Sequence, residues 1–150
     1  MKLTSSAFSH EGKIPSKHTC DGENISPELK ISDVPPNAKT LVLIMDDPDV
    51  PKAVRKDGMW DHWVVFNIAA DVQKIPEGKE PPGTPGIGTN GRTGYYGPCP
   101  PDREHRYFFK LYALDARLTL PEKSTKTAVE KAMADHVIEK DILMGRYKRK

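Results

Sequence analysis

Three short segments place acids, imidazoles or aromatic side chains beside prolines at the end of an apolar run. They are residues 46–51, residues 60–63 and the stretch from 97 to 107. Carboxylate, imidazole and phenol groups that gather at strand ends, held by stiff loops, can make a small polar pocket for an anion. The segments therefore predict an anion-binding site.

Each of these residues also has an ordinary structural explanation. Asp47-Pro48-Asp49 can be an acidic turn whose carboxylates accept backbone hydrogen bonds. His62 can be a half-buried strand histidine. His105 can be one of the polar residues that commonly occur at strand ends. Their coincidence favours a site, because each of the three strongest predicted strands carries Asp or His at one end, next to Pro or Trp.

Charge limits what such a pocket can do. A carboxylate close to a bound phosphate repels it, unless the carboxylate pairs with a histidine and keeps that histidine protonated. Asp47 and Asp49 with His62 and His105 can supply such pairs. The pocket would then accept an anion without a strong net charge of its own.

Other groups in the segments would donate hydrogen bonds or wall the pocket. Tyr107 lies two positions after His105, so both side chains share one face of their strand, and the Tyr107 hydroxyl would donate to the ligand. Backbone N–H groups around Gly97 can form a nest for oxygens. The walls would be a tryptophan and several prolines: Trp60, Pro51, Pro100 and Pro101.

Alternative chemistries fit these residues less well. Two histidines and a carboxylate can bind iron or zinc, but the spacing does not support a metal site. Cys99 beside two prolines indicates a rigid loop rather than an activated thiol. The glycines of residues 86–91 match the spacing of a dinucleotide-binding motif, but no predicted strand precedes them and no predicted helix follows them. We expect no metal, no cofactor and no catalytic residue, and a hydrolase using an Asp–His pair stays an alternative.

Three apolar runs are expected to form the strands that position these residues. Residues 40–45, 61–68 and 106–114 are rich in β-branched and aromatic side chains, which is typical of strands buried on both faces. Weaker strands are expected at 2–5, 29–32 and 142–147.

One helix is expected near the C-terminus. Thr127 and Glu130 have the spacing of a capping box, and Ser124 or Thr125 could cap one turn earlier. One face at helical spacing is apolar: Ala128, Val129, Ala132, Met133, His136 and Val137. A helix packed on a sheet explains this face, and His136 is expected to be a packing histidine.

The segment from 76 to 104 is expected to be a loop that forms part of the site. It holds more than half of the glycines and prolines of the chain and has no apolar period. Long loops of this kind are functional or are linkers, and too little chain follows to make a second core. The sequence therefore predicts a single domain over residues 1–150.

Composition and charge limit the partners. The 150 residues carry a net charge of +2, which is too balanced to favour nucleic acid. The N-terminus lacks the apolar stretch of a signal peptide, and no segment reaches the roughly 20 apolar residues that span a bilayer. We expect a soluble cytoplasmic protein.

In that reducing compartment Cys20 and Cys99 would be free thiols, and a disulfide is the open alternative because both lie in loops that can border the pocket.

Five motifs and a C-terminal segment, in order, carry a resemblance. They are residues 20–27, 47–51, 60–67, 97–101, 105–107 and 143–147. In these residues the chain resembles the phosphatidylethanolamine-binding protein family, which includes the Raf-kinase-inhibitor protein of eukaryotes. The resemblance is greatest to the bacterial and archaeal branch, and it covers nearly the whole chain.

The resemblance implies a mainly β fold: an antiparallel Greek-key β-sandwich with one or two peripheral helices. It also implies a non-catalytic pocket for phosphate-like anions and phosphorylated headgroups such as phosphorylethanolamine. Carried over residue by residue, the ligand-binding positions are Asp47, Asp49, Trp60, His62, Pro100, His105 and Tyr107, with Pro51 and Gly97. A kinase or protease partner and a homodimer are further implications. The alternative is an inhibitor that docks on a kinase or protease by its surface alone.

Overall fold

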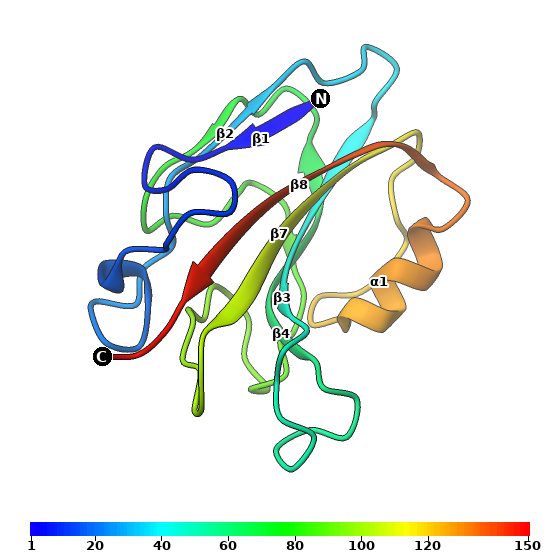
Figure 1. The fold of residues 1–150 in the computed structure, drawn as a ribbon. Coiled ribbons are helices and arrows are strands. Elements are labelled where there is room, and N and C mark those ends of the chain that lie inside the picture. Colours follow the sequence, from blue (N-terminus) through cyan, green and yellow to red (C-terminus); the bar gives the residue numbers. More distant parts are fainter.

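The computed structural model describes residues 1–150 as two antiparallel sheets and one α-helix (Figure 1). The smaller sheet has the order β1-β2-β5, with β1 at Lys2–Thr4, β2 at Leu29–Ser32 and β5 at Lys74–Ile75. The larger sheet has the order β6-β4-β3-β7-β8. Its strands are β6 (Thr84–Pro85), β4 (Trp60–Ala69), β3 (Thr40–Asp47), β7 (His105–Leu114) and β8 (Val137–Tyr147). The expected mainly β, antiparallel fold is confirmed.

The larger sheet has the strand order of a Greek key. Its strands β3, β4 and β6 are successive neighbours, and β7 then returns to the free side of β3. A Greek key has three consecutive hairpin-connected strands with the fourth beside the first. This sheet has that spatial order, but the chain passes through β5 of the smaller sheet between β4 and β6. As a result β3 lies in the middle of the sheet, between β4 and β7.

The main core lies between the two sheets. Leu29 and Ile75 from the smaller sheet face Leu43 and Phe109 from the larger one, and all four are fully or almost fully buried. A second core covers the opposite face of the larger sheet, where α1 (Lys126–Met133) packs Val129 against the sheet (Figure 1). Because both faces are covered, every residue of β3 is buried, which explains its apolar run without alternation.

The helix is shorter than the sequence indicates. Thr125 is its N-cap, with a hydroxyl that accepts a hydrogen bond from the Ala128 N–H at 3.1 Å, so capping begins before Thr127. The helix ends at Met133, and His136 lies beyond it, half exposed, with Nδ1 2.9 Å from Asp115 Oδ1. The expectation that His136 packs on the helix face is wrong, because the chain leaves the helix to begin β8 at Val137.

The remaining helical segment is a short 3-10 turn, η1 (Ser16–His18). Neither it nor the eight residues of α1 provide the length and apolar character that a membrane-crossing helix requires.

Candidate functional site

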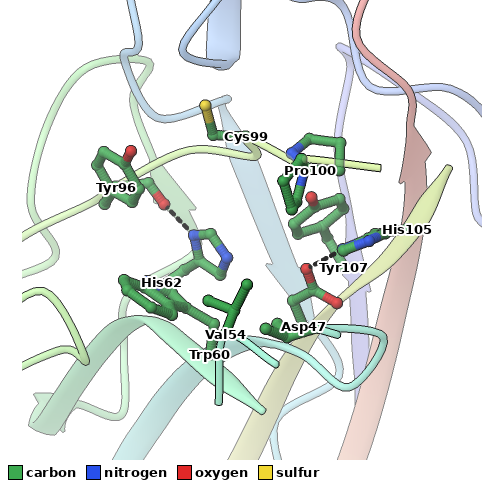
Figure 2. Close-up of a pocket in the computed structure, with 11 residues that line it drawn as sticks. Asp47, Val54, Trp60, His62, Tyr96, Cys99, Pro100, His105 and Tyr107 are labelled. Atoms are coloured by element: carbon green, nitrogen blue, oxygen red, sulfur yellow. Dashed lines mark hydrogen bonds and ion pairs between the residues drawn. The ribbon is translucent and has the colours of Figure 1, made fainter. Parts of the chain in front are cut away.

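A cavity of about 230 Å³ opens where the end of β3 meets the beginnings of β4 and β7 (Figure 2). The antiparallel register sets Asp47 of β3 opposite Trp60 of β4, and Asp46 opposite Phe108 of β7. The central position of β3 therefore brings side chains from three strands to one point. The cavity is lined by Asp47, Val50, Val54, Trp60, His62, Tyr96, Cys99, Pro100, Pro101, His105 and Tyr107.

Six of the sequence-predicted site residues line this cavity: Asp47, Trp60, His62, Pro100, His105 and Tyr107. Three others do not: Asp49, Pro51 and Gly97. Asp49 turns away to form a bidentate pair with Arg106, with oxygen–nitrogen distances of 2.8 and 2.9 Å. This guanidinium holds the pKa of Asp49 below its usual value.

Pro51 and Gly97 shape the loops behind the cavity. The Pro51 carbonyl accepts a hydrogen bond from the Val54 N–H at 2.8 Å and so closes a turn. The Gly97 N–H donates to Asn24 Oδ1 at 2.8 Å, so it is not free to join an anion nest. A Cβ on Gly97 would lie 2.1 Å from the His18 carbonyl oxygen, which explains why only glycine fits there.

His105 lies between two carboxylates. Its Nδ1 is 2.6 Å from Asp47 Oδ2 and its Nε2 is 2.7 Å from Asp102 Oδ1, while the ring itself is fully buried. Two hydrogen bonds to two carboxylates require two protons among the three groups. Burial raises the pKa of the Asp47 carboxyl, against the lowering effect of His105, and His105 lowers the pKa of Asp102.

His62 has a different environment, with no carboxylate on its ring. Its Nδ1 donates to the Tyr96 carbonyl oxygen at 2.6 Å, which leaves Nε2 as the acceptor of a neutral imidazole. Burial lowers the pKa of His62 to about 4. The expectation that a carboxylate keeps both histidines protonated is therefore wrong for His62, because desolvation exceeds every favourable charge near it.

Two lining residues carry a buried polar atom without a hydrogen-bond partner: the Tyr107 hydroxyl and the Trp60 indole N–H. The Tyr107 ring meets His62 edge to face at 5.3 Å between centroids. Burial, followed by the negative charge of Asp47, raises the pKa of Tyr107, so its hydroxyl keeps its proton. Buried polar groups are nearly always hydrogen-bonded in proteins, and an unpaired donor at a cavity is available to a ligand.

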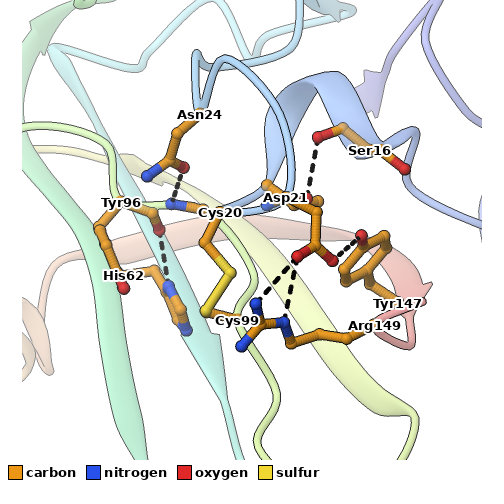
Figure 3. The surroundings of a disulfide bond; sticks show 11 residues. Ser16, Cys20, Asp21, Asn24, His62, Tyr96, Cys99, Tyr147 and Arg149 are labelled. Carbon is orange, nitrogen blue, oxygen red and sulfur yellow. Dashed lines mark hydrogen bonds and ion pairs between the residues drawn. A yellow bond between two sulfur atoms is a disulfide. The ribbon is translucent and has the colours of Figure 1, made fainter.

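The upper wall of the cavity is the loop from 95 to 101, and a disulfide between Cys99 and Cys20 joins it to the N-terminal loop (Figure 3). The expectation of free thiols is wrong, and the alternative of a disulfide between Cys20 and Cys99 is confirmed. The two loops are also joined where Tyr95 donates to the His18 carbonyl at 2.6 Å and where the Cys20 N–H donates to the Pro98 carbonyl at 3.1 Å. These contacts hold a wall that contains no strand.

The sequence reasoning missed several residues of the site, notably Asp102, Tyr96 and Val54. Asp102 has a weak signal, because an acid three residues before a strand histidine can reach its ring. Tyr96 acts through its backbone carbonyl, which no side-chain pattern reveals. The site contains no group of three or more acidic, histidine or cysteine side chains placed to hold a metal ion.

Comparisons with known proteins agree on one family. A family model described as phosphatidylethanolamine-binding protein matches residues 4–148. UPF0098 proteins of Chlamydia trachomatis and Methanothermobacter thermautotrophicus are 49% and 48% identical, and each alignment covers 99% of this chain and 99% of the relative.

Solved structures give the same result. CT736 of Chlamydia trachomatis, a phosphatidylethanolamine-binding protein homologue, superposes with a TM-score of 0.96 at 49% identity over 99% of this chain and 97% of that one. Escherichia coli YbcL, a member of the mammalian PEBP family, superposes with a TM-score of 0.89 at 29% identity over 99% and 98%.

Proposed function

The chain belongs to the phosphatidylethanolamine-binding protein family, and from this premise we propose that its cavity binds a small phosphate-like anion or phosphorylated headgroup. Contacts would come from the six predicted residues that line the cavity, Asp47, Trp60, His62, Pro100, His105 and Tyr107. Asp49, Pro51 and Gly97 would act from behind them by fixing the surrounding loops.

The observation that carries this proposal is the unpaired hydroxyl of Tyr107. An unsatisfied buried donor costs on the order of 1–3 kcal/mol, and a hydrogen bond to a charged partner is stronger than one to a neutral partner. An anionic oxygen in the cavity would accept this bond. The unpaired Trp60 indole N–H adds a second donor in the same lining.

Proton exchange makes the remaining charges compatible with an anion. A neutral His62 offers Nε2 as an acceptor, so it can bind a protonated phosphate oxygen or take up a proton as the anion arrives. The raised pKa of Asp47 favours its neutral form beside a negative ligand. Both effects predict that affinity falls as pH rises.

Hydrolysis by an Asp–His pair receives no support from the geometry. A general base needs a ring nitrogen that can accept a proton from an attacking group. Both nitrogens of His105 already contact carboxylates, whereas His62 has a free Nε2 but no carboxylate on its ring to complete an Asp–His pair. Cys99, the only thiol-derived group in the lining, is in a disulfide.

A kinase or protease partner and a homodimer stay predictions from the resemblance. An inhibitor that docks by its surface alone would keep full inhibition after the pocket is altered, whereas a ligand-controlled regulator would lose the response to its ligand. Tyr107→Phe distinguishes the two. A homodimer would show in sedimentation of the wild-type chain.

The cytoplasmic location also stays a prediction. Disulfides persist mainly in oxidising compartments, so the redox state of Cys20 and Cys99 in intact cells would test it. Rapid alkylation that labels both thiols would support the cytoplasm, and protection from alkylation would argue against it.

The proposed function is tested by calorimetric titration with O-phosphorylethanolamine, inorganic phosphate and sulfate at pH 5.5 and 7.5. Phosphate monoesters lose their second proton near roughly pH 6, whereas sulfate keeps one charge state, so a pH dependence with sulfate reports groups on the protein. We expect saturable binding that weakens at the higher pH, with no phosphate released from the ester.

Tyr107→Phe is the matched variant, since it removes only the hydroxyl. We expect it to weaken anion binding by about tenfold or more, as a lost hydrogen bond to a charged group implies. Tyr112→Phe is the control, because Tyr112 lies in the second core under α1. No binding at millimolar ligand, or equal affinity in wild type and Tyr107→Phe, would overturn the proposal.

A further inference from the structure

The loop from 48 to 59 joins β3 to β4 and protrudes from the end of the sheet where the cavity opens (Figure 1). At its centre is Val54, one of only two large hydrophobic side chains that are exposed, with 54% of its surface accessible. Val54 also lines the cavity, and Figure 2 shows it between His62 and Asp47. An apolar side chain thus stands at the cavity mouth, facing solvent.

Exposed cations surround Val54 on the same loop: Lys52, Arg55 and Lys56. Lys52 and Lys56 form no ion pair, and Arg55 approaches only Asp57, at 3.7 Å between two exposed groups. Such a pair contributes little. We call Lys52, Val54, Arg55 and Lys56 the mouth cluster.

Of the neighbouring acids, only Asp57 lies beside a cation of the mouth cluster, and it offsets one of the three charges at most. Asp49, at the base of the loop, is already bound to Arg106, and Asp102 is bound to His105. Arg103 reaches the loop from the other side of the cavity, where its guanidinium lies 3.4 Å from the Asp49 carbonyl oxygen, but it also lies 3.7 Å from Asp102 and so adds little net charge. The mouth of the cavity is therefore positive, although the net charge of the whole chain is only +2.

The loop is held in shape without strands. The Pro51 carbonyl accepts from the N–H groups of Val54 and Arg55 at 2.8 and 3.1 Å. Gly58, with φ of +67°, donates to the Arg55 carbonyl and accepts from the Val50 N–H. This turn fixes the mouth cluster on the outside of the loop, so little ordering is needed when a partner binds.

We propose that the mouth cluster docks this protein on the surface of an anionic phospholipid bilayer, so that a lipid headgroup faces the cavity. The inference rests on the proposed function and adds where its ligand would be met. Cations that flank one exposed apolar side chain fit the bilayer interface, where the charges stay with the headgroups and the valine enters the acyl boundary. An acidic protein surface would account for the cations but would give the exposed valine no apolar partner.

The size of the effect follows from the charges. A cation close to an anionic leaflet strengthens binding by roughly fivefold, so the three cations together are worth on the order of 100-fold. Exposed charges are screened by salt, with a Debye length of about 10 Å at 0.1 M. Docking should therefore be reversible and should weaken steeply as salt is added.

The test is sedimentation of the protein with vesicles of phosphatidylcholine alone and of phosphatidylcholine with phosphatidylglycerol, at about 0.1 M ionic strength. Lys52→Gln/Arg55→Gln/Lys56→Gln removes the charge of the mouth cluster. Lys2→Gln/Lys39→Gln/Lys131→Gln removes three exposed cations on β1, before β3 and on α1, away from the cavity. Val54→Ser keeps every charge and removes the apolar contact.

We expect wild type and the distant triple variant to bind the anionic vesicles, and the mouth variant to bind them about 100-fold more weakly. Val54→Ser should weaken vesicle binding by severalfold. In calorimetry the mouth variant should bind soluble O-phosphorylethanolamine as wild type does. That measurement separates the two proposals. If wild type does not bind soluble O-phosphorylethanolamine, the proposed ligand pocket is rejected, whereas the docking surface is judged by vesicle binding alone.

Three results would overturn the docking proposal. Wild type could fail to bind anionic vesicles, or both triple variants could lose equal affinity, which would indicate general charge attraction. Binding to a polyglutamate chain, but not to vesicles, through Lys52, Arg55 and Lys56 would assign the surface to an acidic protein instead.

Discussion

The imidazole of His105 and the carboxylate of Asp102 are 2.7 Å apart, and this bond holds the ring on the side opposite Asp47. Asp102 is partly exposed, whereas Asp47 is buried beside the cavity. A surface acid thus fixes the orientation of a cavity residue. Asp102 is a positioning residue, since it does not line the cavity itself.

Asp102→Asn should weaken anion binding by about threefold to tenfold, because the ring of His105 loses its second charged partner. In nitrogen-15 spectra the two ring nitrogens of His105 should become less alike, a change that a general loss of packing would not produce. Asp115→Asn alters a similar pair with His136 at the surface, and it should change neither measurement. An unchanged His105 spectrum in Asp102→Asn would contradict the positioning role.

Tyr107→Phe should leave the free energy of unfolding unchanged or raise it by about 1 kcal/mol, although it weakens ligand binding. The hydroxyl is buried without a partner, so its removal relieves a desolvation cost. Urea unfolding of wild type, Tyr107→Phe and Tyr112→Phe measures this. A clear loss of stability in Tyr107→Phe alone would mean that the hydroxyl is satisfied in the empty protein.

The free energy of unfolding should fall as pH decreases from about 6.5 to about 4, with a contribution from His62. In this window the unfolded histidine takes up a proton, whereas the pKa of the folded residue is lowered to about 4. The unfolded state then binds more protons, which costs stability at up to roughly 1.4 kcal/mol per pH unit. The raised pKa of Asp47 acts in the opposite direction at the acidic end, since protonation of that carboxyl is easier in the folded state.

His62→Gln should flatten this slope by about one proton, as measured by urea unfolding at several pH values. His136→Gln, at the half-exposed position outside the cavity, should keep the slope. A His62→Gln profile parallel to that of wild type would show that another group is responsible.

Cys20→Ser/Cys99→Ser should lower the free energy of unfolding by about 2–4 kcal/mol, because the bond closes a long loop between residues 79 positions apart. A reducing agent should destabilise wild type by the same amount and leave the double variant unaffected. Equal melting of reduced and oxidised wild type would show that the disulfide contributes nothing in solution.

The strands could be predicted from the sequence, because burial on both faces leaves an apolar run in β3 and β4. The same expectation is wrong for the first half of β7, where Arg106, Phe108 and Lys110 alternate with buried residues. Asp47, His62 and Tyr107 follow from their places at the ends of those runs. Asp49 does not, although it is two residues from Asp47. A strand would place both on one face, but the chain turns at Pro48 and directs Asp49 to Arg106.

Other features depend on contacts that no local pattern encodes. The disulfide requires two loops 79 residues apart to meet. The expected reducing compartment is the only basis for predicting free thiols. His136 continues the apolar period of the helix, yet pairing of β8 with β7 ends the helix before it. Asp102 gains its role only after the 99–104 segment folds back over the ring of His105.

The cavity has a floor and a wall of different construction. Strand pairing sets Asp47 opposite Trp60 and Tyr107 opposite Gly145, and His62 lies at the irregularity between the paired residues Asp61 and Trp63. The wall from 95 to 101 is instead attached by one covalent bond and a few hydrogen bonds. The polar contacts proposed for the ligand therefore come from the strands, whereas the wall contributes Pro100 and the shape of the opening. A replacement loop that kept Cys99 and Gly97 could be grafted onto the same sheet. The cavity would then admit ligands of a different size or shape while the strands stayed unchanged.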